Sequence, residues 1–270
     1  AFTWSSVSAT YGDANASITA PTVSGSIGGT WSYASATTSV VAISGSSFDF
    51  GNAGSSVITA TFTPSNTTNY VSGGTVTMTA TVGLSNQSAL TVTSTTGVFG
   101  ASITLATSGG TVAGTPSYVV TGTDCSEVGG VLSKSTAGDC FVTATLAGNS
   151  NYNSVSSSAT TVTFAKAVQA SLTLTSTTGT YGATTTLAFN GGSGTGSISY
   201  SVSGTGCSIS SGVLSRTAAG DCLVTVTKAT DTTYEAASSS ATTVTFAQAS
   251  NTVTFASLAD RLWSASTFTV

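Results

Sequence analysis

Residues 197–227, SISYSVSGTGCSISSGVLSRTAAGDCLVTVT, decide the fold of this chain. At both ends of the stretch, apolar residues alternate with Ser or Thr, a pattern typical of β-strands that bury one face and expose the other. The segments SSG and TAAGD between these runs are rich in Gly and small residues, which favours turns. No part of the chain repeats apolar residues at helical spacing for longer than about one turn. The sequence therefore predicts an all-β protein.

The same pattern recurs along the chain every 82 residues. Residues 88–169 superimpose on residues 170–251 without a gap, with about 46 of the 82 positions identical. A more distant copy precedes these two, because AGSSVITATF (53–62) matches AGDCFVTATL (137–146). With roughly seven short strands in each copy and turns between them, every copy is expected to form a two-sheet sandwich.

The repeats divide the chain into four segments. We place a first repeat, without cysteines, at residues 1–86, a second at 87–168, a third at 169–250, and the opening strands of a fourth at 251–270. The joints TFAKAVQASLTLT and TFAQASNTVTF run almost directly from a last strand into the next first strand. Because they contain no Gly/Ser tether, we expect the repeats to stack end to end as a semi-rigid rod.

Charged residues are scarce throughout. The 270 residues include 5 Lys or Arg, 9 Asp or Glu and no His, whereas an average globular protein is about one quarter charged. The lack of an imidazole predicts that the chain is no enzyme, holds no metal and uses no cofactor. Asp139 and Asp221 stand alone, which indicates strand-end residues rather than a catalytic pair. The net charge of −4 and the lack of a long apolar run disfavour nucleic acid and membrane insertion.

The four cysteines form two pairs with the same spacing. Cys125 and Cys140, and likewise Cys207 and Cys222, lie 15 positions apart, whereas the first copy carries Val41 and Ser56 at the matching places. The joint loss of both partners favours a disulfide within each pair, with free buried thiols as the alternative. Such a bond would stabilise its repeat by about 3 kcal/mol. Disulfides form in oxidising compartments, which predicts a secreted or cell-surface protein.

Residues 191–237, GGSGTGSISYSVSGTGCSISSGVLSRTAAGDCLVTVTKATDTTYEAA, resemble the bacterial immunoglobulin-like repeats found in tandem in large exported surface proteins and adhesins. The resemblance covers residues 88–251 fully, residues 1–87 without the cysteines, and residues 251–270 as opening strands. It implies tandem immunoglobulin-like β-sandwich domains used as spacers, stalks and adhesive modules. Tyr70, Tyr152 and Tyr234 resemble the tyrosine corner of such sandwiches, and the alternative is a partly exposed turn aromatic.

These observations predict a non-catalytic extracellular structural protein, a tandem array that forms a stalk, a fibre or a surface layer. Its expected partners are further copies of itself, bound end to end or laterally. The alternative is an adhesin in which the divergent first repeat binds a host protein or a glycan. Trp4, Trp31 and Trp263 are sugar-stacking candidates under this alternative, although core positions are the stronger interpretation for all three.

Overall fold

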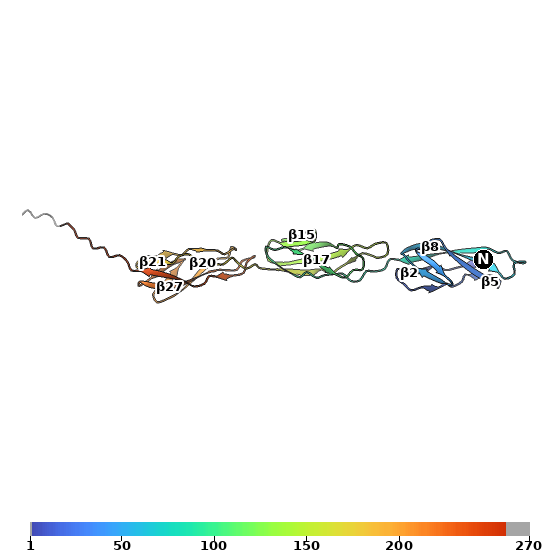
Figure 1. The fold of residues 1–270 in the computed structure, drawn as a ribbon, viewed down its shortest axis with the longest axis horizontal. Helices are drawn as coiled ribbons and strands as arrows, with labels where there is room; N and C mark the ends of the chain where they lie inside the picture. Colours follow the sequence, from blue (N-terminus) through green and yellow to red (C-terminus); the bar gives the residue numbers. More distant parts are fainter. Residues whose placement is uncertain (1, 258–270) are drawn as a thin grey trace, which may run out of the picture. The chain divides into compact units, whose positions relative to one another are not determined.

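The computed structural model of the protein describes residues 2–257 and confirms the all-β prediction. Every regular element in this range is a strand, and the range contains no helix that could span a membrane. The chain forms two compact units, one ending at Lys166 and one beginning at Ala167. The strands of the first unit fall into the groups β1–β9 and β10–β19, and the second unit holds β20–β29 (Figure 1).

The second repeat is a sandwich of two main sheets. The larger sheet has the order β11-β19-β17-β14, with β18 beside β17, and the smaller has the order β12-β16-β15, while β10 pairs with β13. Strand β11 is parallel to β19, and the remaining pairs are antiparallel. This arrangement is an immunoglobulin-like sandwich. The strands are β10 (Thr91–Val92), β11 (Thr96–Val98), β12 (Ile103–Thr104), β13 (Thr107–Ser108), β14 (Ser117–Thr121), β15 (Cys125–Val128), β16 (Val131–Lys134), β17 (Gly138–Leu146), β18 (Val155–Ser156) and β19 (Thr160–Ala165).

The third repeat has the same topology. Its sheets have the orders β21-β29-β27-β24, with β28 beside β27, and β22-β26-β25, and β20 pairs with β23. Cys222 lies opposite Val244, as Cys140 lies opposite Val162 in the second repeat. The strands are β20 (Thr173–Leu174), β21 (Thr178–Thr180), β22 (Thr185–Thr186), β23 (Phe189–Asn190), β24 (Ile198–Ser203), β25 (Cys207–Ser210), β26 (Val213–Arg216), β27 (Gly220–Lys228), β28 (Ala237–Ser238) and β29 (Thr242–Ala247).

The first repeat keeps this order with longer central strands. Its sheets are β2-β9-β8-β5 and β3-β7-β6, and β1 pairs with β4. Strand β2 is again parallel to the last strand, β9. The strands are β1 (Phe2–Thr3), β2 (Val7–Thr10), β3 (Ala16–Ser17), β4 (Thr22–Val23), β5 (Gly29–Ser35), β6 (Val41–Ser44), β7 (Ser47–Phe50), β8 (Gly54–Pro64) and β9 (Gly74–Gly83).

Each repeat has its own core, formed where the alternating strands turn their apolar residues inward. In β17 the side chains of Cys140, Val142 and Ala144 are fully buried, whereas Phe141 between them is exposed. The outward positions of β19 are Thr161 and Thr163, whose β-branched side chains suit a strand. The alternation read from the sequence thus separates core from surface.

The predicted opening strands of a fourth repeat fall largely beyond the part that the structure describes. Residues 251–257 are described as exposed chain without a strand, and residues 258–270 lie outside the described residues, Trp263 among them. A fourth repeat therefore stays a prediction.

Candidate functional site

In the structure, each cysteine pair forms a disulfide across its sandwich. Cys125 begins β15 in the smaller sheet, Cys140 lies on β17 in the larger sheet, and their Cα atoms are 6.0 Å apart. Cys207 on β25 and Cys222 on β27 are joined in the same way, with 5.9 Å between the Cα atoms. Gly122 has a φ of 124°, and a Cβ there would lie 3.0 Å from the Cys125 sulfur, so glycine lets the preceding turn pack closely on the bond.

A cationic side chain accompanies each disulfide, which the sequence interpretation missed. Lys134 is opposite Cys125 in the β15–β16 register, is almost fully buried, and places its Nζ 3.8 Å from the Cys125 Sγ. The ammonium donates a hydrogen bond to the Thr123 carbonyl. Arg216 holds the same place opposite Cys207 and donates through Nε to the Thr205 carbonyl at 3.4 Å. The signal in the sequence is a Lys or Arg nine positions after the first cysteine of each pair.

In the first repeat, other residues occupy the positions of the two cysteines and of the basic residue. Val41 begins β6 as Cys125 begins β15, and it is fully buried opposite Phe50, which stands in the place of Lys134. Ser56 takes the place of Cys140 on β8 and is 2% exposed. Its hydroxyl accepts a hydrogen bond from the Thr37 N–H at 2.9 Å and bonds the Ser35 hydroxyl at 2.8 Å. Apolar packing of Val41 and a buried hydroxyl network around Ser56 therefore take the place of the covalent bond of the other repeats.

One turn of the second repeat fastens that repeat to the first. The Asn151 side chain accepts a hydrogen bond from the Ala53 N–H at 2.9 Å and donates one to the Asn52 side chain at 3.0 Å. Next to it, the ring of Tyr152 meets the ring of Tyr11 edge to face, with centroids 5.3 Å apart. The two repeats of this unit are thus joined by side chains as well as by the chain itself.

The segment between these two repeats is held by hydrogen bonds along its length. The Ser85 N–H donates to the Asn151 carbonyl, and the Asn153 N–H donates to the Ser85 carbonyl, both at 2.9 Å. Two residues later, the buried Gln87 amide donates to the carbonyls of Ala147 and Asn153. The Gln87 carbonyl oxygen accepts from two backbone N–H groups, those of Thr111 and Val112. A segment bound in this way cannot act as a free tether.

In the third repeat, the same pattern of hydrogen bonds holds residues 167–169, which precede the first strand of that repeat. The Ala167 N–H donates to the Thr233 carbonyl and the Glu235 N–H donates to the Ala167 carbonyl, each at 2.9 Å. Gln169 is 5% exposed and donates to the carbonyls of Ala229 and Glu235. The pair Gln87 and Gln169, 82 positions apart, is therefore a structural element of the repeat that sequence reasoning overlooked.

The three predicted tyrosine-corner residues lie in equivalent turns with different surroundings. Tyr152 contacts the first repeat as described above, and Tyr70 is 47% exposed at the other end of that repeat. The turn before Tyr234 is organised by Asp231, whose carboxylate accepts hydrogen bonds from the N–H groups of Thr233 and Tyr234 at 2.8 Å. These bonds hold the pKa of the Asp231 carboxyl well below its usual range. A tyrosine-corner role for the three residues stays a prediction.

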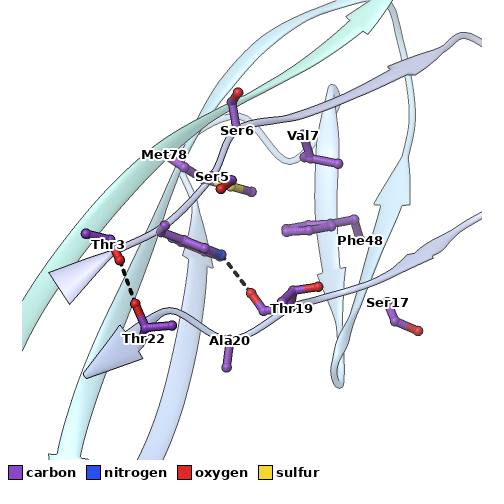
Figure 2. A pocket seen from close by; sticks show the side chains of 11 residues that line it. Thr3, Ser5, Ser6, Val7, Ser17, Thr19, Ala20, Thr22, Phe48 and Met78 are labelled. Carbon is purple, nitrogen blue, oxygen red and sulfur yellow. Dashed lines mark hydrogen bonds between the residues drawn. The ribbon is translucent and has the colours of Figure 1, made fainter. Parts of the chain in front are cut away.

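A cavity of about 340 Å³ opens in the first repeat beside Trp4 (Figure 2). Its lining includes the apolar side chains of Val7, Phe48 and Met78 and the hydroxyls of six Ser and Thr residues. The Trp4 indole N–H donates to the Thr19 carbonyl at 2.8 Å, and the hydroxyls of Thr3 and Thr22 are hydrogen bonded to each other. Trp31, the other described tryptophan, packs against Phe62 with ring centroids 5.0 Å apart.

The isolated acidic residues have structural partners. Asp139 accepts a hydrogen bond from the Thr163 hydroxyl at 2.7 Å, and Asp221 accepts one from the Thr245 hydroxyl at 2.8 Å. Both carboxylates therefore fasten neighbouring strands of the larger sheet. Within residues 2–257, no three His, Cys, Asp or Glu side chains come close enough together to hold a metal ion.

No protein-family model matches the chain, and a comparison with curated proteins also gives no match. Among solved structures, it is similar to repeats EC1–3 of mouse protocadherin-24, with 11% identity, 91% of this chain and 98% of that chain covered, and a TM-score of 0.31. It is similar to EC22–24 of mouse cadherin-23, with 11% identity, 91% and 96% coverage and a TM-score of 0.32.

The chain is also similar to domains 1–6 of the surface layer protein SbsC, with 14% identity over 93% of this chain and 40% of that chain, and a TM-score of 0.29. Similarity this distant says nothing about an activity or a ligand. The function is therefore argued from the residues of the chain itself.

Proposed function

We propose that the chain is a non-catalytic extracellular structural protein, a tandem immunoglobulin-like array that serves as a stalk, a fibre or part of a surface layer. The observation that carries this proposal is the fastened joint between the first two repeats. Asn151 forms hydrogen bonds with two residues of the preceding repeat, and Gln87 holds the connecting segment by hydrogen bonds to the second repeat. In a repeat array, stability is roughly a sum over units and nearest-neighbour contacts, so fastened joints favour a mechanical spacer.

The proposed family is that of the bacterial immunoglobulin-like repeats of exported surface proteins. The motif from Gly191 to Ala237 supports it, as does the sandwich topology of each repeat. The proposed location outside the cell follows from the two inter-sheet disulfides, since such bonds persist in oxidising compartments. The proposed lack of catalysis rests on a chain without His, in which Asp139 and Asp221 are engaged in strand contacts.

The proposed partners are further copies of the chain, bound laterally or end to end. Val57, Phe141 and Leu223 hold the same position in the three repeats, and each is 46% exposed. Few charged residues surround them in this chain, so little electrostatic repulsion opposes the approach of a second sheet face. Light scattering at low and high salt tests this idea. Association that barely changes with salt supports it, whereas a steep salt dependence contradicts it.

The joint itself is tested by the distance between spin labels on the first two repeats. Labels at the exposed positions Ser8 and Thr161 are expected to give one narrow distance distribution in the whole protein. The Asn151→Ala variant removes the side-chain bonds to Asn52 and Ala53 and is expected to broaden it. Asn69→Ala changes the equivalent residue of the first repeat, outside this joint, and serves as the matched control.

Two results of this experiment would overturn the proposal. One is a broad distribution in the unmodified chain, since that would mean repeats that swing freely. The other is an Asn151→Ala distribution as narrow as that of the Asn69→Ala control, since the side-chain contacts would then contribute nothing to the joint.

A second candidate function is ligand binding by the first repeat. The cavity beside Trp4 favours it, because that repeat is the divergent copy and such a cavity offers both apolar and hydroxyl contacts. A host protein or a glycan is the class of partner expected for an adhesive module.

A further inference from the structure

The residues around the cavity beside Trp4 differ in part from those at the equivalent positions of the other two repeats. The pairing of the opening strand with the last strand places Trp4 at the position of Val92 and Leu174, and Ser6 at the position of Ser94 and Ser176. Val92 and Leu174 are buried core residues. The larger indole of Trp4 packs against the edge of the core and against the ring of Tyr33, with 5.6 Å between the ring centroids, and donates its N–H to the Thr19 carbonyl.

In the other two repeats, the serine at this position binds the segment between β12 and β13 or between β22 and β23. The Ser94 hydroxyl accepts a hydrogen bond from the Ala106 N–H at 2.9 Å, and the Ser176 hydroxyl accepts one from the Ala188 N–H at 2.8 Å. The equivalent Ser6 lines the cavity of the first repeat. Figure 2 shows Ser6 at one side of the cavity and Thr19 at another, with Phe48 between the strands.

A backbone difference accompanies the side-chain change at Trp4. From Ala16 to Thr22 the first repeat has one residue more than the second repeat has between the equivalent positions Ile103 and Ser108. The extra residue falls in the segment that carries Thr19 and Ala20, both of which line the cavity. The opening therefore depends on a sequence change in the wall as well as on Trp4.

The chemistry of the lining selects one class of ligand. None of the eleven lining residues is charged, six carry a hydroxyl that can both donate and accept, and Trp4 and Phe48 supply aromatic surface. The volume of about 340 Å³ falls at the lower end of the range of small-molecule sites, roughly 300–1,000 Å³. A sugar ring offers the matching features, which are apolar C–H faces and a rim of hydroxyls.

We propose that this cavity of the first repeat binds a neutral saccharide, either free or as the end of a surface glycan. The serines and threonines contact the sugar hydroxyls, and the aromatic and Met78 side chains contact its apolar face. This inference goes beyond the array function and develops the second candidate. The joint between the repeats lies among other residues, so failure of sugar binding leaves the array proposal unaffected, and the reverse also holds.

The test is an NMR titration of the whole chain with a panel of saccharides. The neutral probes are glucose, galactose, mannose, N-acetylglucosamine, lactose and chitobiose, and sialyllactose is the acidic probe. At least one neutral sugar is expected to shift the Trp4 indole N–H resonance in a saturable way, together with the amides of Ser6 and Thr19. Binding of the same sugar attached to a surface distinguishes the two sources. Comparable affinity for the attached and the free sugar indicates the end of a surface glycan, and binding of the free sugar alone indicates a free saccharide.

Matched variants make the test specific. Ser6→Tyr places a bulky ring in the lining of the cavity and is expected to weaken binding by about tenfold or more, whereas Ser8→Tyr, two positions further on and outside the lining, is expected to leave it unchanged. Two-dimensional spectra of both variants show whether the first repeat stays folded. Saturable binding of no neutral sugar, binding that survives Ser6→Tyr, or binding of sialyllactose alone overturns the proposal.

Discussion

The ring of Tyr152 in the second repeat meets the ring of Tyr11 in the first edge to face, with 5.3 Å between the centroids and 75° between the planes. Edge-to-face geometry is favourable for aromatic pairs because the positive edge of one ring lies over the negative face of the other. This contact lies beside the Asn151 side chain, which bonds Asn52 and Ala53 of the first repeat. Folding of the two repeats should therefore be coupled.

We predict that Tyr152→Ala weakens this coupling by about 0.5–1.5 kcal/mol, the usual contribution of an aromatic pair beyond its buried area. Differential scanning calorimetry should then show the transitions of the first two repeats moving apart. Tyr70→Ala removes the equivalent tyrosine from the first repeat, where the ring is 47% exposed, and should leave the coupling intact. Equal effects of the two variants would contradict this account.

Reduction should destabilise the second and third repeats strongly and the first only slightly, through its contacts with the second. Each disulfide closes a loop of about 16 residues and is expected to contribute about 3 kcal/mol. Urea unfolding followed by the fluorescence of Trp4 and Trp31 reports on the first repeat once Trp263→Phe removes the remaining indole. A large shift of that transition on reduction, or four freely alkylated thiols in the native protein, would rule out this role.

A disulfide can be transferred to the first repeat. Val41 and Ser56 occupy the places of Cys125 and Cys140 and have the same separation of 15 positions. The double variant Val41→Cys with Ser56→Cys should form a bond and raise the free energy of unfolding by up to about 3 kcal/mol. The single variant Ser56→Ala should instead cost about 1–3 kcal/mol, because the Thr37 N–H loses its acceptor. Urea unfolding with and without reductant measures both effects. Thiols that stay free in the double variant would contradict the proposed equivalence.

Acid should destabilise the third repeat through Asp231. Hydrogen bonds from the N–H groups of Thr233 and Tyr234 lower the pKa of its carboxyl from the usual 3.8, so the folded state favours the ionised form. The stabilisation is complete above pH 3.8 and declines as the pH falls below that value toward the lowered pKa. In Asp231→Asn this decline should disappear, as in the second repeat, where Asn149 organises the same turn. Amide exchange between pH 5 and pH 2 measures it, and an unchanged acid response in the variant would exclude Asp231 as the cause.

The strands and the buried faces were predictable from the sequence, because alternation with period two directly encodes a sheet with one buried side. For example, this rule places the Cys140 side chain on the buried face of β17. The equivalence of Val41 and Ser56 to the cysteine pair also followed from the sequence, since the repeats align without ambiguity around AGSSVITATF.

The contacts between elements could not be predicted, because periodicity specifies a face and not a neighbour. Lys134 follows Cys125 by nine positions, yet only the β15–β16 register brings its Nζ next to the sulfur. The resemblance predicts a role for Tyr152 within its own repeat, whereas its ring contacts Tyr11 of the preceding one. The cavity is accompanied by two differences from the other repeats, Trp4 and the extra residue in the segment from Ala16 to Thr22, and neither is a recognisable motif.

Small-angle X-ray scattering of the whole chain tests the central proposal, a tandem array whose first two repeats are joined by side-chain contacts, most directly. We predict the scattering of a thin rod, with a cross-section of one sandwich and a maximum dimension that does not change when metal is chelated, because side chains and backbone groups make the described joint. The scattering of a compact particle, or of a flexible string of independent beads, would contradict the account.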